Sequence, residues 1–157
     1  MAIAWAIALP LAAWIASRPH TTAALSAMTI AIYGIGSIVC HQLPERSFHL
    51  WAVQLPVCAR CTGIYAGAAI CALAPVARAF QTSEGRSAAR RHAQGIPSLS
   101  RDESLARRRG VLVAAAVPSL ATLIYEWTTG DAPSNWIRFA AGLPLGVVVS
   151  ALVVRVN

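Results

Sequence analysis

Long apolar runs alternate with short polar connections along most of this chain. The runs cover about residues 2–17, 22–39, 62–80, 110–127 and 136–154. A helix needs about 20 apolar residues to cross the hydrocarbon core of a bilayer, and all runs but the first approach this length. The pattern therefore predicts an all-α fold in which residues 1–157 form one integral membrane domain, a polytopic bundle of about five transmembrane helices.

The first run also has a competing interpretation as a signal peptide. It is short for a membrane span and contains Trp5, Pro10 and Trp14. However, no basic residue precedes it, and the next apolar run follows almost at once, which is unusual for a signal peptide. We therefore count it among the predicted spans.

Small residues and a capping pattern add detail to the third and fourth runs. Gly63 and Gly67 have the spacing that lets two helix backbones approach closely in lipid. Cys71 lies four residues after Gly67 on the same helical face, and we interpret it as a packing residue. The segment Ser100-Arg101-Asp102-Glu103 fits a capping box, so a helix is expected to begin there and continue into the fourth run.

Composition supports the membrane interpretation and explains the net positive charge of the chain. Of the 157 residues, 57% are hydrophobic and 12% are charged, and the mean hydropathy is +0.57. The 13 basic residues are all arginine and outnumber 6 acids, which gives a net charge of +7. These arginines cluster between apolar runs without a recognition motif, so we expect no nucleic acid as partner and a lipid bilayer instead.

The distribution of arginine predicts an orientation in the cell's inner (plasma) membrane. Residues 81–109 form a basic loop, and with this loop in the cytoplasm ten arginines lie inside and three outside. Positive residues are enriched on the cytoplasmic side of membrane proteins. The amino terminus and the connection between Cys40 and Cys61 are therefore expected outside, and the carboxyl terminus in the cytoplasm.

Candidate chemistry is concentrated between the second and third runs. Cys58 and Cys61 form a Cys-x-x-Cys pair, and Cys40-His41 adds a sulfur and an imidazole. Such a set is suited to binding a metal ion, with zinc favoured over iron, and His49 is a reserve ligand. The main prediction is a Cys/His metal site on the outer side, formed by Cys40, His41, Cys58 and Cys61.

Three other interpretations of the same residues remain open. In the first, the thiols exchange disulfides and pass electrons to a quinone, with the thiolate stabilised by a helix amino terminus and Arg60. In the second, a disulfide only staples the connection, as the oxidising outer compartment would allow. In the third, the protein is an accessory structural subunit of a larger membrane complex that includes other membrane subunits.

A second polar group is predicted near the outer ends of the last two runs. Glu126 ends the fourth run, and Asp131, Asn135 and Arg138 lie around the following turn. Ionisable groups at this depth are costly unless they are paired, so a cluster with Arg46 and Arg60 is expected, and convergent arginines would suit an anionic headgroup or phosphate. The alternative is an ordinary wet interface anchored by Trp127 and Trp136.

Two strings carry a resemblance to a known family. They are Cys-His-Gln-Leu-Pro-Glu-Arg-Ser-Phe, from Cys40, and Leu-Pro-Val-Cys-Ala-Arg-Cys-Thr-Gly-Ile-Tyr-Ala-Gly, from Leu55. Together with Ser134-Asn135-Trp136-Ile137-Arg138, Gly142 and Gly146, they resemble the small prokaryotic membrane proteins called domain of unknown function 2085, over about residues 33–146. The resemblance implies an integral membrane protein with a Cys/His motif, and it implies no established activity.

Overall fold

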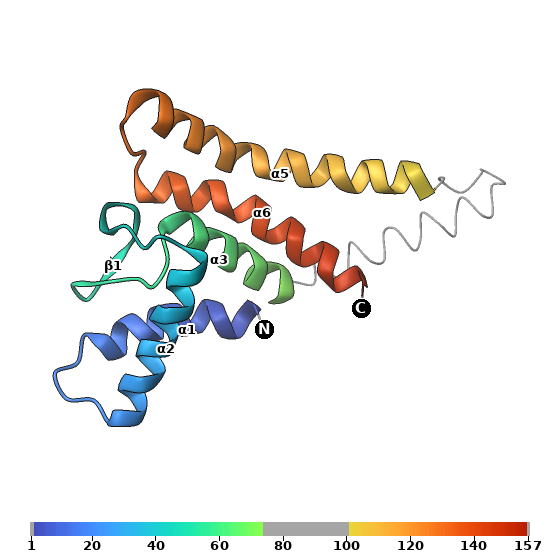
Figure 1. Cartoon of the computed structure of the whole chain (residues 1–157). Helices are drawn as coiled ribbons and strands as arrows, with labels where there is room; N and C mark the ends of the chain where they lie inside the picture. The colour runs from blue at the N-terminus through green and yellow to red at the C-terminus, as the bar shows by residue number, and fades with distance from the viewer. Residues whose placement is uncertain (1, 74–100, 157) are drawn as a thin grey trace.

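The computed structural model describes residues 2–73 and 101–156, and most of these residues are helical. The elements in chain order are α1 (Ala2–Ala16), α2 (Ala23–Val39), the short 3-10 helix η1 (Pro44–Arg46), β1 (His49–Leu50), β2 (Val53–Gln54), α3 (Ala59–Leu73), α5 (Arg101–Thr129) and α6 (Asn135–Val156) (Figure 1). The α-helices follow the five apolar runs. The predicted helical class is therefore confirmed, and the connection between α2 and α3 adds one small antiparallel hairpin.

Helix boundaries agree with the local sequence signals. The Thr22 hydroxyl caps α2 by accepting a hydrogen bond from the Leu25 N–H at 3.5 Å. Helix α5 begins at Arg101, where the capping pattern predicts a start. The predicted basic loop over residues 81–109 lies largely outside the described residues, and its last part, residues 101–109, forms the first turns of α5.

Among the helices that the structure describes, α3 and α6 make the closest contact. A Cβ added to any of four glycines would collide with a carbonyl oxygen of the partner helix: Gly63 with Phe139, Gly67 with Leu143, Gly142 with Arg60, and Gly146 with Ile64. The paired positions advance together, so the two helices run parallel with their amino-terminal ends side by side (Figure 1). The close approach predicted at Gly63 and Gly67 is confirmed.

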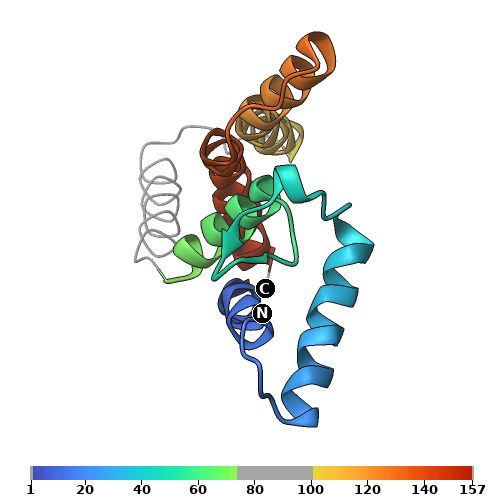
Figure 2. The same ribbon diagram turned by 90° about the vertical axis from the view of Figure 1, so that its left-hand side faces the viewer.

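The remaining helices pack around this pair. Helix α6 runs antiparallel to α5. The turn between them contains Gly130, whose φ of +75° suits glycine. The Ser119 hydroxyl donates a hydrogen bond to the Ala141 carbonyl at 2.8 Å and so joins α5 to α6. Helix α1 lies against α3, and α2 packs against α1 at a steep angle to α3, α5 and α6 (Figures 1 and 2).

Only two of the described helices are long and apolar enough to cross a membrane. They span Leu105–Thr129 and Asn135–Val153. Helices α1 and α2 have 15 and 17 residues, which corresponds to about 22 to 26 Å against a hydrocarbon core of about 30 Å. Helix α3 has 15 residues up to Leu73, where the described part of the chain ends. The predicted bundle of five spans is therefore not confirmed, because neither helix length nor the steep angle of α2 supports it.

The direction of α1 bears on the predicted orientation. Its chain direction is opposite to that of α3, and the indole ring of Trp5 near its start contacts the ring of Tyr65 with centroids 6.1 Å apart (Figure 1). The amino terminus therefore points toward the end of the bundle where α6 finishes. This arrangement does not support the prediction that the two termini lie on opposite sides of the membrane.

The surface of the long helices is apolar. Val113 on α5 is 63% exposed, Trp127 is 77% exposed, and Trp136 on α6 is 72% exposed. Large apolar side chains in such numbers on a helical surface are typical of a protein surrounded by lipid, with tryptophan concentrated at the interface with water.

Candidate functional site

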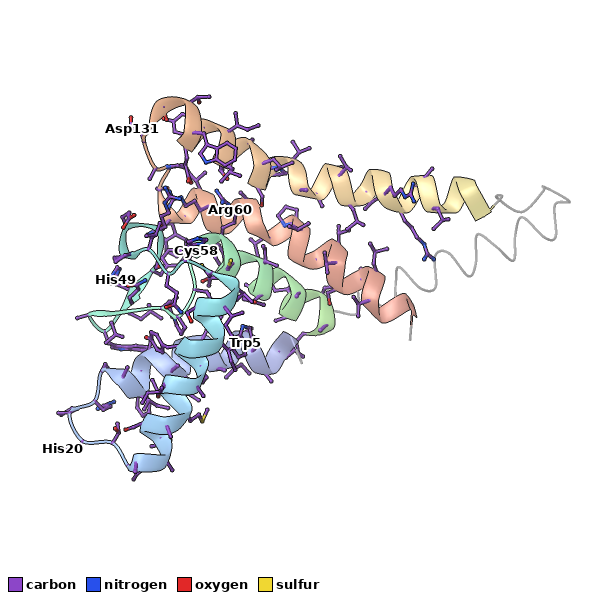
Figure 3. The ribbon with its side chains drawn as sticks, viewed as in Figure 1. Trp5, His20, His49, Cys58, Arg60 and Asp131 are labelled. Carbon is purple, nitrogen blue, oxygen red and sulfur yellow. The ribbon has the colours of Figure 1, made fainter. Side chains whose placement is uncertain are left out.

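Three of the four cysteines come together at one end of the bundle. Cys40 caps the carboxyl end of α2, Cys58 immediately precedes α3, and Cys61 lies in the first turn of α3. Their sulfur atoms all lie within 4.8 Å of one another. We call these three residues the cysteine centre. The β1–β2 hairpin lies at the same end of the bundle as the cysteine centre, and we call this end of the bundle the hairpin end (Figure 3).

A network of amide side chains closes the connection between α2 and α3. Gln42 has a left-handed backbone with a φ of +50°, and its Nε2 donates hydrogen bonds to the carbonyl oxygens of Tyr33 at 2.9 Å and Pro56 at 2.6 Å. Gly36 allows the segment that contains Pro56 to approach α2, because a Cβ at Gly36 would collide with the Pro56 carbonyl. These contacts fasten the end of α2 to the segment just before Cys58.

A second glutamine completes the same network. Gln54 donates from Nε2 to the Gln42 carbonyl at 2.5 Å, and its own carbonyl accepts from the Tyr33 hydroxyl at 2.5 Å. Partly buried polar groups of this kind stabilise one loop conformation because each lost partner would leave a less satisfied group. Cys40 is therefore held beside Cys58, although 17 residues separate them in the sequence.

The thiols of the cysteine centre are not equivalent. The Cys58 N–H donates to Cys40 Sγ at 3.2 Å. The hydrogen bond from the Cys61 thiol, opposed by burial, lowers the pKa of Cys58 to about 5. The same hydrogen bond and burial raise the pKa of Cys61. The Cys61 thiol therefore favours the thiolate form of Cys58 by donating a hydrogen bond to it.

The predicted histidine ligands do not join this group. His41 and His49 are both exposed, and His49 lies on the hairpin away from Cys58 (Figure 3). Within residues 2–73 and 101–156, the potential metal ligands that come together are the three cysteines alone. Cys71 is buried further along α3, as expected for a packing residue. All four cysteines are free thiols.

A charged cluster lies next to the cysteine centre. The Glu126 carboxylate near the end of α5 contacts three guanidinium groups: Arg138 Nε lies 2.8 Å from Oε1, Arg60 Nη2 lies 3.3 Å from Oε1, and Arg46 Nη1 lies 3.4 Å from Oε2. Four elements supply these side chains, because Arg46 belongs to η1, Arg60 to α3, Glu126 to α5 and Arg138 to α6. We call these four residues the charged cluster.

Burial within the charged cluster increases from Arg46 to Arg138. The side chains of Arg46, Arg60 and Arg138 are 43%, 21% and 2% exposed, and that of Glu126 is 4% exposed. Arg60 Nη2 also donates to the Thr122 hydroxyl at 2.9 Å. The outer edge of the cluster is thus Arg46, and its interior is the Glu126–Arg138 pair.

The two other predicted polar residues behave differently from each other. Asn135 borders the charged cluster, and its Nδ2 donates to the carbonyl oxygen of the buried Ser47 at 3.0 Å, which joins α6 to the loop after η1. Asp131 is exposed in the turn between α5 and α6, and its backbone N–H donates to the Thr129 hydroxyl at 3.2 Å (Figure 3).

The sequence-based prediction missed the residues that hold these groups in place. Thr122 lies four residues before Glu126 on the same face of α5, so helical spacing would have revealed it. Gln42 and Gln54 had no such signal, because their partners are backbone carbonyl oxygens set by the loop conformation.

The family model for the predicted membrane proteins called DUF2085 matches residues 40–152. The match begins at Cys40, the first residue of the cysteine centre, and includes every residue of the charged cluster. The chain belongs to the DUF2085 family. Members are described as predicted membrane proteins, which agrees with the two long apolar helices and the apolar surface.

Two relatives share a short stretch of this DUF2085 chain. One is an uncharacterized protein of Methanocaldococcus jannaschii, 48% identical over 40 residues, which cover 26% of each chain. The other is an uncharacterized protein of Methanothermobacter thermautotrophicus, 57% identical over 30 residues, which cover 19% of this chain and 27% of the relative. The matched stretch thus spans about a quarter of the length of these relatives. No solved structure matches the chain.

Proposed function

We propose that this membrane protein binds one metal ion, zinc, at the cysteine centre, on the extracytoplasmic side. The observation that carries the proposal is the convergence of three sulfur atoms from two separate chain segments. Zinc suits this donor set because it takes thiolate ligands in tetrahedral geometry and does not change oxidation state in the process.

The distances between the sulfur atoms are compatible with one shared ion. Zinc–sulfur bonds of about 2.3 Å in a tetrahedron place two sulfurs about 3.8 Å apart. The sulfurs of the cysteine centre lie within 4.8 Å of one another, so they would need to close by at most about 1 Å. Cys58 already favours the thiolate form that a metal requires.

A fourth ligand is needed to complete a tetrahedral structural site. His41 follows Cys40 directly and is exposed, so its imidazole would have to turn inward to reach the ion. A water molecule is the other source of a fourth ligand. The variant His41→Ala separates these cases: a large loss of zinc affinity supports imidazole, and unchanged affinity supports water.

Metal analysis of the purified protein tests the proposal. We expect one zinc per chain with three thiols that become reactive only after chelation, and Cys58→Ser should abolish stoichiometric zinc. Cys71→Ala is the matched control, because it removes a buried thiol outside the cysteine centre and should leave the zinc content unchanged. Absence of metal together with an oxidised Cys58–Cys61 pair would contradict the proposal and would favour thiol–disulfide exchange, in which two thiols lose two electrons and two protons to an acceptor such as a quinone.

We propose that the protein lies in the inner membrane. The hairpin end then faces the extracytoplasmic side, and the end of α6 faces the cytoplasm. Arg107, Arg108 and Arg109 lie near the start of α5, away from the hairpin end, where α5 finishes (Figure 1). The positive-inside rule favours that end for the cytoplasm. A membrane-impermeant maleimide should label Cys58 in intact cells after chelation and reduction, and labelling from the cytoplasmic side alone would overturn this orientation.

A further inference from the structure

The charged cluster holds more positive charge than its own acid can balance. Three guanidinium groups surround one carboxylate, that of Glu126, which leaves two positive charges in excess. Buried charges in proteins are normally paired, because removing a charge from water is costly. Glu126 can balance only one of the three positive charges, so the charged cluster attracts an anion.

Unpartnered donors indicate where this anion would bind. Arg138 has a side chain that is 2% exposed, and its Nη1 and Nη2 are buried without a hydrogen-bond partner in the described residues. Its Nε is close enough to Glu126 for an ion pair but does not make a well-aligned hydrogen bond. The Nε atoms of Arg46 and Arg60 are also buried and unpartnered. Buried donors of this kind are rare unless a ligand or water satisfies them.

The position of the charged cluster restricts the kind of anion that can reach it. Arg60 and Arg138 lie in the first turns of α3 and α6, which run parallel and direct the positive ends of their dipoles to the same place. The exposed indoles belong to Trp127, which follows Glu126 in the sequence, and Trp136, which lies two residues before Arg138. Exposed tryptophans mark the depth of lipid headgroups. Arg46, with 43% of its side chain exposed, is the entry point.

We propose that the charged cluster is a binding site for a phosphate group, carried by a lipid headgroup or free in solution. A phosphate monoester carries about −1.5 to −2 charges at neutral pH, which matches the excess of two positive charges. Its tetrahedral oxygens accept the forked hydrogen bonds that arginine offers, whereas chloride would balance only one charge and accept no forked pair. This site does not depend on a metal at the cysteine centre.

Binding to purified full-length protein in dodecyl maltoside micelles tests the site. The probes are inorganic phosphate and short-chain phosphatidic acid, with phosphatidylcholine at equal mole fraction as the lipid control. We expect saturable binding of one phosphate group per chain and a rise in melting temperature that phosphatidylcholine does not produce. If inorganic phosphate binds and phosphatidic acid does not, the ligand is free phosphate; if only phosphatidic acid binds, it is a headgroup. Displacement of bound phosphatidic acid by inorganic phosphate shows that both occupy the same site.

The variant Arg46→Gln links binding to the charged cluster. It removes the exposed arginine and leaves the Arg60 and Arg138 contacts of Glu126 in place, so the fold should persist. The loss of one charge-assisted contact should weaken phosphate binding by roughly tenfold or more. The matched control is Arg18→Gln, which removes an arginine that stacks on Trp14 at 4.5 Å from the ring centroid, outside the cluster.

A second variant tests the sign of the charge argument. Glu126 competes with the phosphate group for the same guanidinium groups, so Glu126→Gln should tighten binding in the protein that remains folded, an effect that a purely structural role would not produce. The proposal is overturned if neither phosphate source binds the wild type, or if Arg46→Gln binds as tightly as Arg18→Gln. Protein treated with a chelator should bind phosphate as tightly as untreated protein does. Failure of the zinc proposal can therefore be distinguished from failure of the phosphate proposal.

Discussion

The cysteine centre and the charged cluster are neighbours that are assembled in opposite ways. The cysteine centre is built within residues 40–61, where a hydrogen-bonded loop brings the end of α2 to the start of α3. The charged cluster collects one side chain from each of four elements between Arg46 and Arg138. Arg60, placed between Cys58 and Cys61, is the point where the two meet.

The two regions also differ in the charge that completes them. Thiolates bind a cation, whereas three arginines around one glutamate attract an anion. A local centre of this kind can be disturbed through its ligands without moving the helices, whereas the charged cluster depends on how the helices pack. The two therefore respond differently to substitution, and their common support is the α3–α6 contact.

Separation of α3 from α6 should have the largest effect and should abolish the difference between the two regions. The double variant Gly142→Val, Gly146→Val places side chains where even a Cβ would collide with the carbonyl oxygens of Arg60 and Ile64. We expect a loss of more than about 3 kcal/mol in the free energy of unfolding, with zinc and phosphate binding both lost. Thermal unfolding in detergent measures this.

Gly34 and Gly110 provide the matched control for that experiment. Both are helical, and a Cβ at either would meet nothing within 4 Å. Alanine at these positions should be neutral or stabilise by about 0.5 to 1 kcal/mol. A stable Gly142→Val, Gly146→Val protein would show that the glycine contact does not hold the two regions together.

The next largest effect should be confined to the charged cluster. Arg138→Gln leaves the buried Glu126 carboxylate without its nearest partner at 2.8 Å, and we expect a loss of about 3 kcal/mol in the free energy of unfolding. Arg46→Gln should cost less than about 1 kcal/mol, because that ion pair is solvent-screened. Zinc content should be normal in both variants. Equal losses of stability would contradict the gradient of burial.

Loss of a ligand should affect only the cysteine centre. Cys40→Ser and Cys58→Ser each remove one sulfur, so both should lower zinc content and melting temperature by similar amounts. At a zinc concentration 100 times the dissociation constant, the lost stabilisation is about 2.7 kcal/mol. A Cys40→Ser protein with unchanged zinc content and melting temperature would show that Cys40 is not a ligand, even if Cys58 is.

The last prediction concerns the proton within the cysteine centre and not the stability of the fold. In metal-free protein, alkylation of Cys58 should rise with pH through a midpoint near 5, because the thiolate reacts and the pKa of Cys58 is lowered to about 5. Cys61→Ala removes the donor that stabilises the thiolate, so the pKa should rise toward the ordinary thiol value of about 8.5 and alkylation at pH 6 should slow. Mass spectrometry of the labelled peptide measures the rate. An unchanged midpoint would exclude Cys61 as the cause.

The sequence predicted the features that depend on local pattern. Apolar runs and capping residues located the helices, and the spacing of Gly63 and Gly67 predicted the close contact that α6 makes with α3. The three cysteines of the cysteine centre were all among the predicted ligands, because a Cys-x-x-Cys pair and a neighbouring cysteine are visible as a motif. Polar residues at the outer ends of apolar runs indicated the charged cluster.

Features set by long-range packing could not be predicted in the same way. Hydropathy gives the length of an apolar run but not the direction of its helix, so the steep angle of α2 and the reversed direction of α1 were not anticipated (Figure 2). Gln42, directly after His41, has a left-handed backbone, which no local rule requires of glutamine. Whether zinc binds at the cysteine centre stays a prediction.

The parallel contact of α3 and α6 has a consequence for biosynthesis. About 70 residues separate the end of α3 from Gly142, so at 5 to 20 residues per second α3 waits about 4 to 14 s for its partner. We expect the glycine face of α3 to contact another protein or lipid during this interval, with Arg60 not yet paired to Glu126. A photo-crosslinker at Ile64, beside Gly146 in the folded chain, should capture other partners in ribosome-stalled chains that end before α6 and capture α6 in the complete chain.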